Sequence, residues 1–165
     1  MSLSDDLERI ALQEKELTLK RLDAETAWTI GSKLRTMAAE RKLAVVIDVR
    51  RFGQPLFYAA MDGTTPDNVE WVRRKSNVVA RFHRSSYAVG LHEKNKGQSI
   101  YESQGLSLGE FATHGGSFPL SVEGAGIVGS VTVSGLPMRQ DHELVIEALC
   151  SLLGRDYATL KLPPE

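Results

Sequence analysis

The sequence predicts a single α/β domain in which helices pack as a layer against β-strands. Amphipathic helical patterns lie at both ends of the chain, and two separate stretches rich in β-branched residues each have the length of a strand pair. A long helical pattern and a short helical region separate the two strand pairs. No repeat or linker interrupts this order, so we expect one layered domain over residues 1–158 and a tail over residues 159–165.

Composition excludes several classes of protein. The chain has 165 residues, of which 42% are hydrophobic and 25% are charged, as is ordinary for a globular protein. A formal net charge of −1 argues against nucleic acid as a partner, and the single cysteine, Cys150, excludes an internal disulfide. No apolar run reaches the roughly 18 residues that span a bilayer. The first residues also lack a basic region followed by an apolar run, so we expect a cytoplasmic protein with no membrane partner.

Two amphipathic helices are expected before the first strand. The first covers residues 3–19, where Asp5 and Asp6 favour the positive end of the helix. The second has Asp23 as its N-cap and ends near Arg41. Its apolar positions share one side: Ala27, Ile30, Leu34, Met37 and Ala38.

A strand pair and a long helix follow. Residues 43–49 read as a buried strand, and a short turn connects them to residues 55–60 in an antiparallel hairpin. Thr65 is the expected N-cap of the next helix, with Pro66 at its first position. This third helix is predicted to continue to about Ser86. Short helices and loops are expected over residues 87–110.

The region from residue 115 to residue 135 carries six of the 14 glycines together with a run of β-branched residues. Within it, residues 124–129 spell G-x-G-x-x-G, which binds dinucleotides only when a helix begins at its last glycine. A strand pattern follows instead, over residues 130–135, so we predict a glycine-hinged β-hairpin. A final amphipathic helix is expected over residues 138–153, with Gly154 as its stop signal.

Basic residues gather on the predicted third helix. No acidic residue lies between Trp71 and His92. The basic side chains on the helix are Arg73, Arg74, Lys75, Arg81 and Arg84. Guanidinium groups bind carboxylates and phosphates in a bidentate manner, so this helix is a candidate anion site. The alternative is a solvated basic face that pairs with the acidic first helix.

Four histidines occur in the chain: His83, His92, His114 and His142. No two of them have the short helical spacing of a zinc motif, so no closed metal site is expected. A single histidine can still be the axial ligand of a haem. His114 precedes two glycines on a loop that can approach a flat ligand, and His83 is expected to face the core side of the basic helix. A structural role is the alternative for each.

Ser85 and Ser86 lie between the basic helix and the next segment. No G-x-S-x-G elbow surrounds them, which argues against a serine hydrolase. Helix capping and turn bonding would account for their hydroxyl groups.

Short motifs along nearly the whole chain occur in a specific combination: Asp62-Gly63-Thr64, Asp67-Asn68, Trp71, Arg74-Lys75, Ser85-Ser86, His114 to Pro119, Val133 to Leu136 and Asp141-His142. Together they resemble uncharacterised protein family 0303. That family belongs to the wider haem-degrading-domain group, which includes the glycolate-operon accessory protein, a haem-binding sensor partner and the C-terminal domain of a cobalamin adenosyltransferase. Features of this group are a lysine on the central helix, here Lys75, and a Gly-Gly-x-x-Pro segment, here beginning at Gly115.

The resemblance implies an α/β fold similar to profilin, with a central antiparallel sheet flanked by helices and assembly into homo-oligomers. It also implies binding of haem or another small anionic ligand between the sheet, the central helix and the glycine loops. The expected pocket residues are Lys75, His83, Ser85, Ser86, His114, Gly115 and Gly116. Lys75 would meet carboxylates, and His114 or His83 would be available to iron.

Two alternatives remain open. The first is an accessory protein that binds a small carboxylate such as glycolate, and the second is a non-enzymatic assembly or adaptor protein. Nothing in the sequence specifies oxygen activation, so no catalytic residue is assigned.

Overall fold

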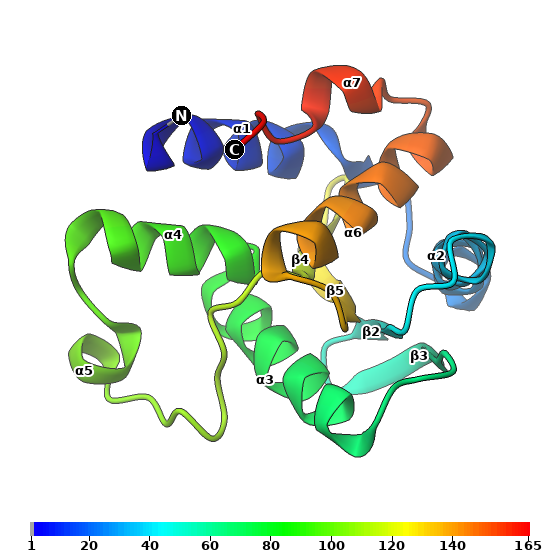
Figure 1. The fold of residues 1–165 in the computed structure, drawn as a ribbon. Helices are drawn as coiled ribbons and strands as arrows, with labels where there is room; N and C mark the ends of the chain where they lie inside the picture. Colours follow the sequence, from blue (N-terminus) through cyan, green and yellow to red (C-terminus); the bar gives the residue numbers. More distant parts are fainter. Residues whose placement is uncertain (1) are drawn as a thin grey trace.

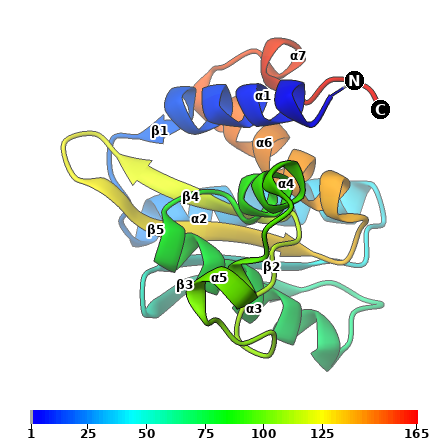
Figure 2. The ribbon, with the colours of Figure 1, turned by 90° about the vertical axis from the view of Figure 1, so that its left-hand side faces the viewer.

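A five-stranded sheet forms the centre of the protein, and helices lie on both of its faces (Figures 1 and 2). The computed structural model describes residues 2–165. The strands are β1 (Thr18–Leu19), β2 (Val46–Arg51), β3 (Gln54–Ala60), β4 (Ser117–Val122) and β5 (Gly126–Ser134). Their order across the sheet is β1-β4-β5-β2-β3; β1 is parallel to β4, and all other neighbours are antiparallel. The predicted α/β class with one sheet flanked by helices is confirmed.

Seven helices surround the sheet within the described residues: α1 (Leu3–Glu16), α2 (Ala24–Glu40), α3 (Pro66–Phe82), α4 (Ser86–Lys96), α5 (Ile100–Gln104), α6 (Met138–Leu153) and α7 (Tyr157–Leu160). The predicted caps of two helices are confirmed, since Asp23 accepts a hydrogen bond from the backbone of Thr26 and Thr65 begins α3. α1 ends earlier than predicted because Leu17 leaves the helical region and the next two residues pair with β4.

The main hydrophobic core fills the space between the sheet and the helices α2 and α6. The sheet contributes Ile47, Val49, Phe118, Leu120, Val131 and Val133, and the helices contribute Ala27, Ile30, Leu34, Leu144, Val145 and Leu149. Cys150 is buried in this core, where loss of solvent raises the pKa of its thiol to about 11. The predicted inward face of α2 is therefore confirmed, and α3 lies on the opposite face of the sheet.

The third helix is shorter than predicted. α3 ends at Phe82 because His83 adopts a left-handed conformation, with φ of 54°, and donates its backbone N–H to Val79. A new helix, α4, then begins behind Ser85, whose hydroxyl accepts a hydrogen bond from Ala88. The prediction that His83 faces the core is wrong, since this exposed ring stacks on Phe52 with the ring centroids 5.7 Å apart.

The glycine-rich region forms the predicted hairpin. β4 and β5 pair antiparallel across a turn at residues 123–125, and β5 continues to Ser134 without a helix after Gly129. The strand that was predicted over residues 43–49 begins at Val46 and ends at Arg51, and it pairs with β5 along this whole length. No helix within residues 2–165 combines the length and the apolar character needed to cross a membrane.

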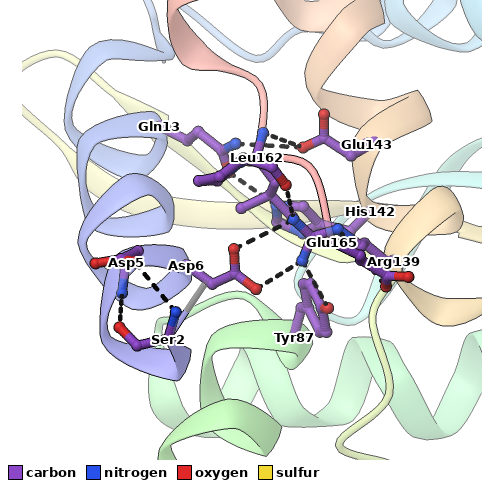
Figure 3. Close-up of polar contacts among 11 residues, drawn as sticks. Ser2, Asp5, Asp6, Gln13, Tyr87, Arg139, His142, Glu143, Leu162 and Glu165 are labelled. Atoms are coloured by element: carbon purple, nitrogen blue, oxygen red, sulfur yellow. Dashed lines mark hydrogen bonds and ion pairs between the residues drawn. The ribbon is translucent and has the colours of Figure 1, made fainter.

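The C-terminal residues pack against α1 and α6 through polar contacts (Figure 3). Leu160 and Leu162 are both buried. Gln13 donates from Nε2 to the carbonyl oxygen of Leu160 over 2.7 Å, and the backbone N–H of Leu162 donates to Glu143 over 3.2 Å. The segment expected as a tail, residues 159–165, thus contributes apolar side chains to the folded unit.

His142 is buried beside this contact between α1 and α6. Its Nε2 lies 2.8 Å from Oε1 of Gln13. Since an amide oxygen only accepts hydrogen bonds, Nε2 must carry the proton. Burial, with a smaller contribution from the charge of Arg139, lowers the pKa of His142 from 6.5 to about 3.

Acidification is therefore expected to destabilise the protein through His142. Below a pH of about 6.5 the unfolded state binds a proton that the folded state excludes, so stability falls by up to about 1.4 kcal/mol for each pH unit. Urea unfolding at about pH 7 and about pH 5 measures this loss. A His142→Gln variant, which cannot bind the proton, should lose less stability between the two conditions. An equal loss in both proteins would assign the effect to other groups.

Candidate functional site

A cavity of about 240 Å³ opens where α3, the end of β5 and the start of α6 meet. Its lining residues are Asp67, Asn68, Trp71 and Lys75 of α3, His114 of the loop before β4, Ser134, Gly135 and Leu136 at the end of β5, and Met138 and Asp141 of α6. Two of the predicted site residues, Lys75 and His114, lie together in this cavity. They are 39 positions apart in the sequence, and the fold brings them to one place.

Lys75 is held by a buried ion pair at this cavity. Its Nζ lies 3.0 Å from Oδ2 of Asp141 and donates to the carbonyl oxygen of Val133 over 3.3 Å. Burial lowers the pKa of Lys75 and raises the pKa of Asp141, and the attraction between the two charges opposes both shifts. An ammonium group has three donors, so one N–H of Lys75 remains available to a ligand.

The carboxylate of Asp141 has further partners that fix its position. The backbone N–H groups of Gly135 and Leu136 donate to it over 3.3 Å and 2.9 Å. The turn after β5 therefore holds Asp141, and Asp141 in turn orients Lys75 from the facing helix.

Gly115 and Gly116 are buried behind the cavity and allow the loop to approach its neighbours closely. A Cβ atom on Gly116 would overlap the carbonyl oxygen of Val133 and would lie 2.9 Å from Nζ of Lys75. A Cβ atom on Gly115 would overlap the carbonyl oxygen of Met138. The two glycines thus leave room for Lys75 and for the start of α6, although neither lines the cavity itself.

His114 lies at the rim of the cavity with its ring edge-on to Trp71, at a centroid distance of 4.8 Å. The guanidinium of Arg74 covers the same indole at 4.7 Å. Partial burial of the imidazole, together with the positive charges of Lys75 and Arg74, lowers the pKa of His114. The ring is therefore neutral near neutral pH and can accept a hydrogen bond or coordinate a metal.

A second cavity, of about 250 Å³, lies beside the first one. Its lining residues are Tyr87, Gly90, Leu91, Glu93 and Lys94 of α4, together with Thr113, His114 and Met138. His114 and Met138 border both cavities. Among residues 2–165, no three His, Cys, Asp or Glu side chains gather in a group that would hold a metal ion.

The remaining predicted site residues lie outside both cavities. Ser86 accepts a hydrogen bond from the backbone of Ser117 over 3.1 Å, and Ser85 caps α4. Both serines are fully buried, which agrees with the structural alternative for their hydroxyl groups. His83 lies at the far end of α3, opposite the end that opens into the first cavity.

The basic stretch divides between two roles. Arg84 forms an ion pair with Glu14 of α1 over 3.2 Å. This contact agrees with the alternative interpretation, in which the basic face pairs with the acidic first helix. Arg73 pairs with Glu70 and Glu110. Of the basic residues in this stretch, only Lys75 and Arg74 lie by the first cavity. Lys75 is part of its lining, and Arg74 lies over the indole of Trp71.

Sequence reasoning missed Asp141 and Met138 as site residues. The sequence does contain a signal for Asp141 as a site residue, because Asp141 lies beside His142 in one of the motifs that carry the family resemblance. Met138 had none, since a methionine at the start of an amphipathic helix is an ordinary packing residue.

Known proteins are similar to this sequence over nearly its full length. A family profile described as "Haem degrading protein HbpS-like" matches residues 22–150. A UPF0303 protein of Acidobacterium capsulatum is 61% identical over 163 residues, which are 99% of each chain. A UPF0303 protein of Burkholderia thailandensis is 59% identical over 162 residues, which are 98% of each chain.

Solved structures share the fold. The Ybr137w protein superposes with a TM-score of 0.82 and 26% identity over 90% of this chain and 87% of that chain. HbpS gives a TM-score of 0.64 at 20% identity, over 86% and 96% of the two chains. The structure of the PduOC:heme complex gives a TM-score of 0.68 at 17% identity, over 79% of this chain and 94% of that chain. Sequence and structure together confirm the resemblance: the chain belongs to the HbpS-like haem-degrading protein family, and its relatives within that family bear the name UPF0303.

Proposed function

We propose that the protein binds haem or another small anionic ligand at the cavity that Lys75 and His114 share. The observation that carries this proposal is the presence of a buried ammonium group and an imidazole in one open cavity. The family description and the haem complex among the structural neighbours support haem as the ligand.

The size and chemistry of the two cavities decide how a haem would fit. Each cavity is smaller than the roughly 300–1,000 Å³ typical of sites for drug-sized ligands. A haem would therefore have to extend across both of them, past His114 and Met138. Both side chains belong to the types that bind haem iron. Lys75, Arg74 and Lys94 supply positive charge for the propionates, so the residues present fit this group.

Each residue at the cavity would make a different contact with the ligand. The available N–H of Lys75 would donate to a carboxylate, while Asp141 keeps the ammonium in place. The neutral ring of His114 would accept a hydrogen bond or coordinate iron. Trp71 would offer an aromatic surface beside it. A bound haem would add a redox-active iron to this set of groups.

Titration with haem, followed by absorbance, tests the proposal. The parent protein should give a saturable shift of the Soret band, and His114→Ala should weaken binding by about tenfold or more, since it removes the candidate iron ligand. His83→Ala is the matched control: its exposed ring lies away from both cavities and should not change the titration. Equal losses in the two variants would contradict the assignment of the site.

A small carboxylate is the second candidate ligand, and the size of the first cavity favours it. A volume of about 240 Å³ beside one buried ammonium suits a short acid such as glycolate. A flat response to haem, together with thermal stabilisation by small acids, would select this candidate. Assembly into homo-oligomers and a cytoplasmic location stay predictions. An adaptor without a ligand would respond to neither titration.

A further inference from the structure

Lys75 is the one buried lysine among residues 2–165, and it lines the first cavity. The other lysines of the chain are exposed or half-buried: Lys15, Lys20, Lys33, Lys42, Lys94, Lys96 and Lys161. A buried amine loses its hydration, and this loss is what shifts the pKa of lysines that act as nucleophiles. The fold therefore places a lysine with unusual surroundings at the wall of a cavity.

Asp141 is a proton acceptor in direct contact with this amine. Its Oδ2 lies 3.0 Å from Nζ of Lys75, and both residues line the same cavity. Burial lowers the pKa of Lys75 and raises the pKa of Asp141, so both shifts favour transfer of a proton from the ammonium to the carboxylate. The neutral amine that results is the form of lysine that attacks a carbonyl carbon.

We propose that Lys75 forms a Schiff base with a small aldehyde or ketone in the first cavity, with Asp141 as the carrier of the proton. Nζ gives a proton to Oδ2 of Asp141, and its lone pair forms a bond to the carbonyl carbon. A second proton moves from the nitrogen to the former carbonyl oxygen and completes a carbinolamine. Asp141 then returns its proton to this hydroxyl group, which leaves as water while the C=N bond forms.

The charges of the pair are the same before and after this reaction. The ammonium begins with one positive charge, and the protonated imine ends with one, so Asp141 regains a cationic partner. The imine retains a single N–H, which can donate to Asp141. The longer hydrogen bond to the carbonyl oxygen of Val133, at 3.3 Å, is the one given up. The product thus leaves no buried charge without a partner.

The volume of the cavity limits the carbonyl compound to a small one. About 240 Å³ is less than the roughly 300–1,000 Å³ of sites for drug-sized ligands, so only a short carbon chain fits. Trp71 and Leu136 supply apolar surface for such a chain. A neutral aldehyde requires neither iron nor a negative charge on the ligand, so its binding is independent of the proposed function.

Reductive labelling of the native protein tests the Schiff base. The probe is acetaldehyde at neutral pH with sodium cyanoborohydride, which reduces an imine to a stable secondary amine. Peptide mass spectrometry then gives the modification rate of each lysine. Lys75 should react about tenfold or more faster than Lys94, since each unit by which a pKa is lowered increases the neutral amine about tenfold. Burial alone predicts the opposite order, because Lys94 is exposed and lines the second cavity.

The comparison of two lysines within one molecule requires no variant that could fail to fold. Lys75→Arg adds a second measurement, since arginine keeps a positive charge beside Asp141 but forms no imine with acetaldehyde at neutral pH. The fast label should be absent from this variant, while Lys94 reacts as in the parent. A rate at Lys75 less than about tenfold above that of Lys94, or a fast label that persists in Lys75→Arg, would overturn the Schiff base. The haem titration of the parent is a separate measurement, so failure of either one leaves the other standing.

Discussion

Replacing Lys75 with methionine is expected to destabilise the protein by about 3–5 kcal/mol, the range for breaking a buried ion pair by removing one partner. Methionine fills a similar volume, so the loss arises mainly from the charge of Asp141, which would stay buried without its ammonium partner. Gly135 and Leu136 would still donate to that carboxylate and would limit the loss. Urea unfolding at neutral pH measures the change in free energy.

Two comparisons make this result specific to the buried pair. Arg73→Met breaks exposed ion pairs on the same helix and should change stability by about 1 kcal/mol or less. Combining Lys75→Met with Asp141→Asn removes the lone charge and keeps one acceptor oxygen, although Gly135 and Leu136 donate to different oxygens of Asp141 and one of these N–H groups would lose its acceptor. The double variant should therefore be more stable than Lys75→Met alone. A loss below about 1 kcal/mol in Lys75→Met would show that the pair contributes little.

Adding one methyl group at Gly116 is expected to cost about 2–6 kcal/mol. Its φ of 137° strains any residue with a Cβ atom, and that atom would overlap the carbonyl oxygen of Val133. The methyl group would also press on Nζ of Lys75, so Gly116→Ala should weaken ligand binding as well as the fold. Urea unfolding and the haem titration measure the two effects.

Gly109→Ala is the matched control for this substitution. The nearest atom to a Cβ there is Oγ of Ser107 at 3.5 Å, an ordinary contact, and Gly109 has no positive φ. The control should stay within about 1 kcal/mol of the parent. If Gly116→Ala were as stable as the control, the loop would have more room beside Val133 and Lys75 than the close contacts at Gly116 indicate.

Local signals were sufficient to predict most of the fold. Asp23 and Thr65 mark helix starts through hydrogen bonds within one turn, and the hairpin from β4 to β5 follows from neighbouring residues. β1 escaped prediction because it is two residues long and exists only through its pairing with Ser121 and Val122. Its formation depends on a strand about 100 positions away, which no local pattern describes.

The candidate site was harder to predict for the same reason. Basic character and family motifs identified Lys75 and His114, yet the partner of Lys75 is Asp141, 66 positions further along the chain. A helical pattern that continues past Phe82 predicts that His83 faces the core, whereas the helix ends at Phe82. The left-handed conformation of His83 ends that helix and turns the side chain to solvent, so helical periodicity no longer applied.

The single thiol in the core gives the molecule an internal reporter of its own motions. Cys150 is buried and its thiolate is disfavoured, so a thiol-specific reagent can modify it only in molecules whose α6 has opened away from α2 and the sheet. The modification rate therefore measures how often this part of the core opens. Because no other cysteine competes for the reagent, the native chain yields that opening free energy without any substitution.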